Sequence, residues 1–168
     1  SIYGKSKTLG EEEVMKYSNS VAFRFATAFG VSPRLRLDLL VNDLSYSAHK
    51  QKYIAVYESH FMRTFIHVRD IARVFMFAVE NESPMSNQIY NVGSNSMNFS
   101  KGDVCKLIQK KTNCYVHYAD FDGDADKRDY AVSYDKINKL GYDTTVSVDE
   151  LLKVFPIVQM DNKRYKNG

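Results

Sequence analysis

Two tyrosine–lysine pairs have the residue types and the spacing that acid–base chemistry needs. Tyr3 and Lys7 stand four residues apart, as do Tyr46 and Lys50, and residues four apart share one face of a helix. A lysine ammonium beside a phenol stabilises the phenolate, which can then act as a general base near neutral pH. Roughly one such pair is expected by chance in a chain this rich in tyrosine and lysine. The spacing alone does not choose between the pairs, and Tyr46 with Lys50 is most simply interpreted as an ordinary pair on a helix surface.

Motifs for phosphate and metal binding are missing from the sequence. None of the eight glycines forms a Gly-x-Gly pair, which excludes a dinucleotide-binding turn and a P-loop within this chain. The run Asp120–Asp126 resembles a calcium loop, but its sixth and twelfth positions are Ala125 and Ala131 instead of glycine and glutamate. The four histidines form no His-Glu-x-x-His motif, and the two cysteines form no Cys-x-x-Cys motif. The sequence therefore predicts no metal site.

The composition limits the classes of protein to which this chain can belong. With 168 residues, 44% of them hydrophobic and 26% charged, the chain suits one ordinary domain or one domain with part of another. The formal net charge of +3 is too small to indicate nucleic-acid binding. No apolar run approaches the roughly 18 residues of a membrane span, and the N-terminus has no signal-peptide core. Cys105 and Cys114 are interpreted as thiols of a reducing compartment. We therefore expect a cytoplasmic location, with neither a membrane nor a nucleic acid as partner.

Helical and strand patterns alternate along the chain, which indicates an α/β or α+β fold. Val21–Phe29 is an almost continuous apolar run, typical of a strand buried on both faces, although Arg24 interrupts it. Asp70 is placed to cap a helix, and Ser100 with Asp103 resembles a capping box that opens another. The remaining expected elements are helices over 7–17, 37–44, 71–79, 133–140 and from 147 onward, and strands over 53–57, 64–68, 88–92 and 115–118.

Five blocks of sequence occur in an order that is typical of one enzyme family. They are SIYGKSK at 1–7, VAFRFATAFG at 21–30, RTFIHVRDIA at 63–72, IYNVGS at 89–94, and DKRDY at 126–130 followed by KINKLGY at 136–142. The first block contains a Tyr-x-x-Ser-Lys segment that leads through a helix into the second. Together the blocks resemble the extended short-chain dehydrogenase/reductase family, the NAD-dependent nucleotide-sugar epimerases and dehydratases.

The resemblance implies a fold and a pair of catalytic residues. The fold would be α/β, the C-terminal part of a Rossmann-type extended short-chain dehydrogenase/reductase fold with its small α/β substrate domain. Tyr3, as phenolate, would take the proton of a sugar hydroxyl while hydride passes to the nicotinamide of NAD or NADP. Lys7 would favour the phenolate and hold the nicotinamide ribose, so both residues would also contact the cofactor.

The resemblance also implies a binding site for a nucleotide-diphosphate sugar. Arg63 and Arg128 would hold the diphosphate, work that suits the paired hydrogen-bond donors of a guanidinium group. Arg36 and Asn42 would face the substrate. Without the resemblance, a lone arginine is most simply interpreted as a surface cation.

Family members open with a glycine-rich turn and further strands, which this chain lacks ahead of Tyr3. We therefore expect the chain to correspond to about the C-terminal half of a family member and to bind no NAD or NADP by itself. The expected divisions are 1–30, with the catalytic helix and a strand of the nucleotide-binding domain; 31–69, in the substrate domain; 70–95, returning to the nucleotide-binding sheet; 96–160, the C-terminal substrate domain; and 161–168, a tail. The choice among epimerase, dehydratase and reductase stays open.

Two function classes remain as alternatives. Retention of Tyr3 and Lys7 favours an enzyme, whereas the missing cofactor glycines favour a non-catalytic binding or assembly module derived from the same fold. An unpaired strand edge beside the apolar run 21–29 favours self-association, expected as a homodimer. A Gly-x-x-Gly-x-x-Gly segment encoded upstream of Ser1 would decide for the enzyme.

Overall fold

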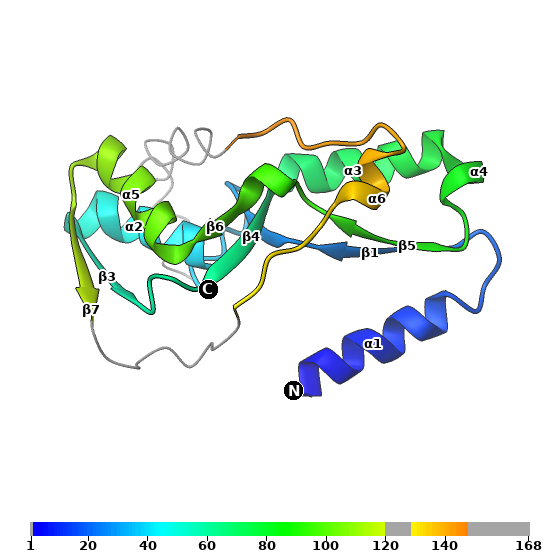
Figure 1. The fold of residues 1–168 in the computed structure, drawn as a ribbon, viewed down its shortest axis with the longest axis horizontal. Helices are drawn as coiled ribbons and strands as arrows, with labels where there is room; N and C mark the ends of the chain where they lie inside the picture. The colour runs from blue at the N-terminus through cyan, green and yellow to red at the C-terminus, as the bar shows by residue number, and fades with distance from the viewer. Residues whose placement is uncertain (1, 120–128, 148–168) are drawn as a thin grey trace.

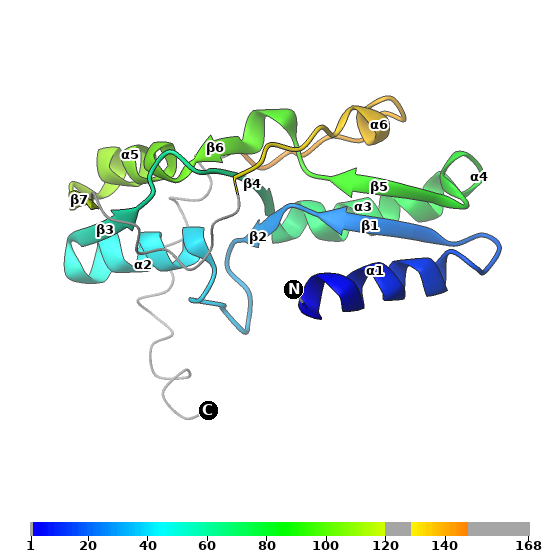
Figure 2. The same ribbon diagram turned by 60° about the horizontal axis from the view of Figure 1, so that its bottom comes forward.

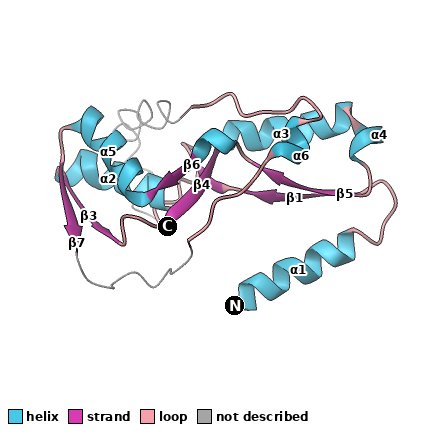
Figure 3. Ribbon diagram, viewed as in Figure 1, coloured by secondary structure: helices cyan, strands magenta, loops and turns pink. Residues whose placement is uncertain are grey.

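The computed structural model describes residues 2–119 and 129–147. The molecule is an elongated α/β structure (Figure 1), and the described strands form three small sheets. A lobe around β1 (Val21–Phe25) lies at one end of the long axis, and a lobe around β3 (Tyr53–Tyr57) lies at the other. Between them lies β4 (Met62–His67), as Figure 3 shows by element type. These are called the β1 lobe and the β3 lobe below.

The β1 lobe is built on two parallel strands. β1 pairs with β5 (Gln88–Val92), and parallel neighbours need a crossover connection, which here contains α3 (Val68–Glu80) and α4 (Glu82–Met85). α1 (Ile2–Val14) lies on the opposite side of the strand pair from α3 (Figure 1). The core of this lobe consists of Ala26, Ile66, Val74, Met85, Tyr90, Val92, Tyr134, Ile137 and Tyr142.

The β3 lobe pairs β3 in parallel with β7 (Tyr115–Ala119). Ile54 and Val56 point into the lobe while their neighbours along β3 are exposed, as the two-residue period of a strand dictates. α2 (Leu40–Gln51) and α5 (Lys101–Thr112) contribute the rest of the interior. The core of this lobe consists of Phe29, Val41, Leu44, Ala48, Ile54, Val56, Phe65, Met97, Val104, Cys105, Ile108, Cys114 and Val116.

A third sheet joins the two lobes. Its order is β2 (Thr27–Phe29), β4 and β6 (Asn98–Ser100), with β2 parallel and β6 antiparallel to β4. β6 follows the short η1 turn (Asn95–Met97), and Ser100 then caps α5 by accepting a hydrogen bond from the Asp103 amide at 3.0 Å. The predicted cap at Ser100 is therefore confirmed.

Both cysteines are buried, unpaired thiols in the β3 lobe. Burial, with a smaller contribution from nearby Cys114, raises the pKa of Cys105 to about 12. A thiol of this kind forms little thiolate at neutral pH and reacts slowly. The interpretation of Cys105 and Cys114 as ordinary thiols agrees with this environment.

The expected strand over residues 21–29 is divided at Ala26 into β1 and β2, which pair with different strands. The Ala26 amide donates to the Val92 carbonyl at 3.0 Å, at the point where the chain passes from one sheet to the next. The expectation of burial on both faces is wrong for β1, because Arg24 and Phe25 are exposed and the first three residues are half-buried.

Several helix bounds also differ from expectation. α1 begins at Ile2 rather than at residue 7, and Leu37 lies in the loop before α2. Within 133–140 the helix is limited to α6 (Asp135–Asn138), and most of the helix expected from 147 lies outside the described residues. The predicted strands at 53–57 and 88–92 are confirmed. None of the helices in the described part of the chain is both long and apolar enough to cross a membrane.

The N-terminus of α3 corrects one sequence-based prediction. Asp70 does not cap this helix: His67 is the cap, and its Nδ1 accepts a hydrogen bond from the Arg69 amide at 3.1 Å. The helix begins earlier than expected because Val68, predicted to end a strand, is its first residue.

Asp70 instead joins the N-terminus of α3 to the segment after α6. Its fully buried carboxylate accepts hydrogen bonds from the Thr145 amide and hydroxyl, both at 3.0 Å, and from the Val146 amide at 3.1 Å. Arg73 donates to the same carboxylate at 2.7 Å. The Tyr142 hydroxyl donates to the Asp70 carbonyl at 2.7 Å. These contacts hold residues 142–146 against α3.

Gly93 makes room for a buried tyrosine. A Cβ added at this position would lie 2.5 Å from Cζ of Tyr134, a ring that is 1% exposed and whose hydroxyl bonds to that of Thr64. We expect Gly93→Ala to lower the free energy of unfolding by about 1–3 kcal/mol through overpacking, measured by urea unfolding. Gly10→Ala is the control, because no heavy atom lies within 4 Å of its added Cβ. Equal stability of the Gly93→Ala variant and the parent chain would show that the Tyr134 ring can move aside.

Candidate functional site

A cavity of about 660 Å³ lies between α1 and β1. Its lining consists of Tyr3, Ser6, Lys7, Gly10, Glu11 and Val14 from α1, and residues 21–25 from β1. Figure 2 shows α1 running beside β1 on the outer side of the β1 lobe. Because α1 buries none of its side chains, its polar groups are accessible to a ligand at this wall.

Tyr3 and Lys7 share the α1 wall of this cavity. Lys7 Nζ lies 5.3 Å from the centroid of the Tyr3 ring, over its face, and the Tyr3 side chain is 71% exposed. The Ser6 hydroxyl donates to the Tyr3 carbonyl at 2.8 Å, one of the local bonds within the helix. The pair thus presents a phenol and an ammonium group together to solvent. The predicted placement of both residues on one helix face is confirmed.

The second pair has a different setting. Tyr46 and Lys50 lie on α2 in the β3 lobe, where Tyr46 is partly buried and Lys50 is exposed. Their position agrees with the interpretation as an ordinary pair at a helix surface.

Arg36 lies in the loop between β2 and α2. Its Nε donates to Asp38 Oδ1 at 2.8 Å, and this hydrogen bond, with the charge of Asp38, raises the pKa of Arg36. An electrostatic interaction with Tyr3 makes the smallest contribution to the same pKa. The fold therefore brings Arg36 into the neighbourhood of Tyr3, although more than 30 residues separate them in the sequence.

Asn42 is buried in the first turn of α2, and its side chain forms two hydrogen bonds with the loop between β2 and α2. Its Oδ1 accepts a hydrogen bond from the Gly30 amide at 3.2 Å, and its Nδ2 donates to the Arg36 carbonyl at 2.9 Å. Asn42 thus fixes the path of the chain from the end of β2 to Arg36. A direct contact of Asn42 with substrate stays a prediction.

Arg63 is 5% exposed on β4. Its Nη1 donates to the Met62 carbonyl at 2.8 Å, and its guanidinium carbon lies 5.9 Å from the centroid of the Phe61 ring. The Met62 amide in turn donates to Asp129 Oδ1 at 2.8 Å. The chain at residue 129 therefore returns to the start of β4, beside Arg63. Arg128 itself lies outside the described residues.

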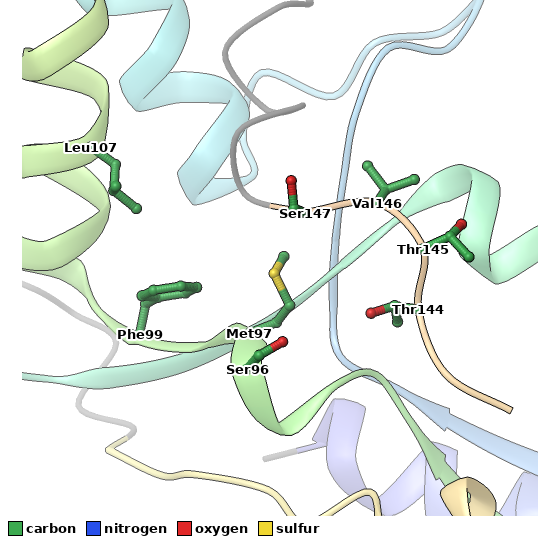
Figure 4. A pocket seen from close by; sticks show the side chains of 8 residues that line it. All are labelled: Ser96, Met97, Phe99, Leu107, Thr144, Thr145, Val146 and Ser147. Carbon is green, nitrogen blue, oxygen red and sulfur yellow. The ribbon is translucent and has the colours of Figure 1, made fainter. Parts of the chain in front are cut away.

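A second cavity, of about 350 Å³, lies between α5 and the segment held by Asp70 (Figure 4). It is lined by Ser96, Met97, Phe99, Leu107, Thr144, Thr145, Val146 and Ser147. Hydroxyl and apolar groups dominate this lining, and no residue in it can act as an acid or a base near neutral pH. The cavity beside Tyr3 and Lys7 is therefore the better candidate for proton-transfer chemistry.

Sequence reasoning missed two features that shape the site. One is the ion pair between Glu11 on α1 and Arg24 on β1. Its signal in the sequence is Arg24 itself, a charged residue inside the apolar run 21–29. The other is the role of Asp70, which holds the segment lining the second cavity through partners such as Thr145, 75 residues away in the sequence. Among the described residues, no group of three or more His, Cys, Asp or Glu side chains could hold a metal ion, and the aspartate-rich run 120–126 lies outside them.

Comparisons with known proteins agree with this architecture. The sequence profile described as "NAD dependent epimerase/dehydratase family" matches residues 1–93. Among solved structures, dTDP-glucose 4,6-dehydratase from Bacillus anthracis in complex with NAD has a TM-score of 0.78 at 18% identity, over 99% of this chain and 54% of that one. A GDP-6-OMe-4-keto-L-xylo-heptose reductase from C. jejuni also has a TM-score of 0.78, at 14% identity, over 95% and 61% of the two chains.

A third similar structure is UDP-glucuronic acid 4-epimerase from Bacillus cereus in complex with UDP-glucuronic acid and NAD. Its TM-score is 0.69 at 21% identity, over 83% of this chain and 45% of that one. At these identities the likeness establishes the fold, and the predicted α/β, Rossmann-type class is confirmed. The chain spans about half the length of the solved structures that it matches.

Proposed function

Because this chain belongs to the NAD dependent epimerase/dehydratase family, we propose that it supplies the acid–base pair and part of the substrate surface of an NAD(P)-dependent nucleotide-sugar epimerase or dehydratase. The observation that carries the proposal is the cavity beside α1, where Tyr3 and Lys7 stand together on one accessible wall. Similar structures contain NAD, and one also contains a nucleotide sugar, which supports both ligand classes.

In the proposed reaction Tyr3 acts as the base. As phenolate it accepts the proton of a sugar hydroxyl, and it returns the proton when the reaction reverses at that carbon. The Lys7 ammonium, which lies over the Tyr3 ring, is close enough to interact with the negative charge that the phenolate carries in this reaction. The exposed Tyr3 phenol is free to reach a substrate. The hydrogen bond between a catalytic base and its substrate often becomes short and well aligned only when the substrate is bound.

The same two side chains fit the ribose of a nicotinamide cofactor. A phenol hydroxyl and an ammonium on one accessible wall offer donors to a vicinal diol. The cofactor, when bound, would accept and return the hydride of the sugar carbon. That this chain binds no NAD or NADP by itself stays a prediction.

We assign the diphosphate of the substrate to Arg63 and Arg128. The return of the chain at Asp129 to the start of β4 supports this assignment, because it brings the neighbour of Arg128 to the strand that carries Arg63. Arg36, near Tyr3, is assigned to the substrate side of the same site. Binding energy from the diphosphate would then position the sugar at Tyr3.

A non-catalytic assembly module is the second candidate, and the exposed apolar surface of the β1 lobe favours it. Ile2 and Leu9 on α1 and Val79 on α3 are 89%, 64% and 75% exposed. The exposed side chains of Ile2 and Leu9, two helical turns apart on α1, suit contact with another chain, whereas Val79 lies on the other side of the strand pair. Homodimer formation therefore remains part of the proposal.

The diphosphate assignment predicts selective loss of binding. We expect Arg63→Ala to weaken the binding of UDP-glucose, dTDP-glucose or GDP-mannose, whichever binds the parent chain, by about 1–3 kcal/mol in calorimetric titration, through loss of a charge-assisted hydrogen bond. Arg69→Ala, which removes an exposed arginine nearby, is the matched control. Free glucose should bind equally to all three proteins. Loss of binding for the nucleotide sugar and the free sugar alike would assign Arg63 to stability instead.

A further inference from the structure

The position of α1 is not explained by hydrophobic burial. None of its residues is buried, and its apolar side chains Ile2, Leu9 and Val14 are 89%, 64% and 46% exposed. The hydrogen bonds of the Ser6 and Thr8 hydroxyls stay within the helix, with acceptors on Tyr3 and Gly4. A surface helix is normally held by an apolar face packed on its neighbour. A polar contact must therefore contribute to holding this helix beside β1.

Glu11 and Arg24 form such a contact. Arg24 Nε donates to Glu11 Oε2 at 2.7 Å, and Arg24 Nη2 donates to Glu11 Oε1 at 2.6 Å. Two parallel bonds of this type fix the relative orientation of the two groups as well as their separation. The Glu11 side chain is only 17% exposed, although that of Arg24 is 59% exposed. The hydrogen bond from Arg24 also lowers the pKa of Glu11, so the carboxylate stays charged near neutral pH.

The place of Glu11 on the helix connects this contact to the candidate site. Tyr3, Lys7 and Glu11 follow one another at intervals of four residues, which places them along one face of α1. All three line the cavity beside β1. A bond that directs Glu11 toward β1 therefore directs Tyr3 and Lys7 toward the same wall.

The contact also accounts for a charged residue within an apolar strand. Arg24 lies between Phe23 and Phe25, opposite Asn91 of β5. A valine or isoleucine there would suit the strand pattern better. The reach of a guanidinium group to a helix on the outer side of the strand gives a physical reason for arginine at this position.

We propose that the Glu11–Arg24 ion pair positions α1, and with it Tyr3 and Lys7, against β1. Both are positioning residues, since their effect on chemistry is exerted through the helix. The structural part of this inference is independent of the reaction, whereas its consequence for catalysis rests on the proposed function.

Hydrogen exchange of the full 168-residue chain, followed by mass spectrometry, tests the inference. We expect Glu11→Gln and Arg24→Gln each to raise exchange within residues 2–14 about five-fold, the effect of losing one well-formed ion pair. The double variant Glu11→Arg with Arg24→Glu should restore protection. Glu13→Gln is the matched control, because Glu13 pairs with Lys16 near the end of the same helix.

Exchange at residues 88–92 of β5 separates helix positioning from general stability. We expect it to be unchanged in every variant, and a parallel rise there would overturn the inference. Unchanged exchange of α1 in both single variants would also overturn it. If α1 loosens while the same substitutions in a full-length context leave kcat for a nucleotide sugar unchanged, positioning by Glu11 and Arg24 is upheld and the assignment of Tyr3 and Lys7 to catalysis fails. A fall in kcat with KM retained, reversed in the swapped double variant, supports both.

Discussion

In a full-length context that includes the cofactor-binding part of the fold, Tyr3→Phe is expected to lower kcat for a nucleotide sugar by about 10²–10⁴-fold, the contribution typical of a general base. The change removes the phenolate oxygen that accepts the proton and leaves the ring under the Lys7 ammonium. Because little binding surface is lost, the affinity for the nucleotide sugar should change little. Steady-state kinetics together with calorimetric titration of the same substrate measure the two quantities separately.

Tyr46→Phe provides the matched control for this prediction. Tyr46 belongs to the second pair with the same spacing, yet it lies on α2 in the other lobe. We expect its kcat to equal that of the parent protein. A Tyr3→Phe variant that keeps full activity would show that the base is a different residue, and a Tyr46→Phe variant that loses activity would identify it.

Local sequence patterns correctly predicted the elements whose first and last residues are determined by residues close to them in the sequence. β3 and β5 have the expected bounds, since each is an alternating or apolar run that ends at turn-forming residues. Ser100 was correctly identified as a cap because its partner, Asp103, is three residues away. The common helix face of Tyr3 and Lys7 followed from the helical period alone.

The features that sequence patterns did not predict depend on partners distant in the chain. The break of the apolar run at Ala26 arises because β5 and β4 pair with successive parts of it, and an apolar period contains no information about partners. Aspartate often caps helices, but in α3 the cap position is occupied by His67 and not by Asp70. Its carboxylate was therefore available for a segment that begins more than 70 residues later.

The candidate site also has one part that sequence could predict, the choice of residues, and one part that depends on the fold, their arrangement. The resemblance of the sequence blocks to the family was sufficient to select Tyr3, Lys7 and Arg63, because the first block contains the tyrosine and the lysine and the third contains the arginine. The proximity of Arg36 to Tyr3 and the bond between Glu11 and Arg24 required the three-dimensional arrangement of α1, β1 and the loop after β2. Those contacts determine which way the candidates face.

Asp70→Asn is expected to give the largest loss of stability among the single substitutions considered. The carboxylate accepts hydrogen bonds from two amides, a hydroxyl and the Arg73 guanidinium, and it is fully buried. Asparagine replaces one acceptor oxygen by a donor that faces these donors, and it leaves Arg73 without its charge partner. We expect the free energy of unfolding to fall by about 3 kcal/mol, the upper end for losing a hydrogen bond to a charged group, and the half-exposed Arg73 adds little to this loss. Chemical unfolding measures the loss, with Asp43→Asn as a control at an exposed carboxylate in α2.

The stabilising effect of Asp70 should also depend on pH in a defined direction. Burial alone would raise the pKa of Asp70, but the hydrogen bonds from Thr145, Arg73 and Val146 outweigh it, and the pKa is lowered in the folded chain. A carboxyl whose pKa is lower when folded stabilises the fold above its unfolded pKa of about 3.9, and this stabilisation is lost as the pH falls through the folded value. We therefore expect the difference in stability between the parent chain and Asp70→Asn to be constant near neutral pH and to shrink on acidification below about pH 4. A difference that stays constant or grows over that acidic range would show that the Asp70 carboxyl is not the charged acceptor of this network.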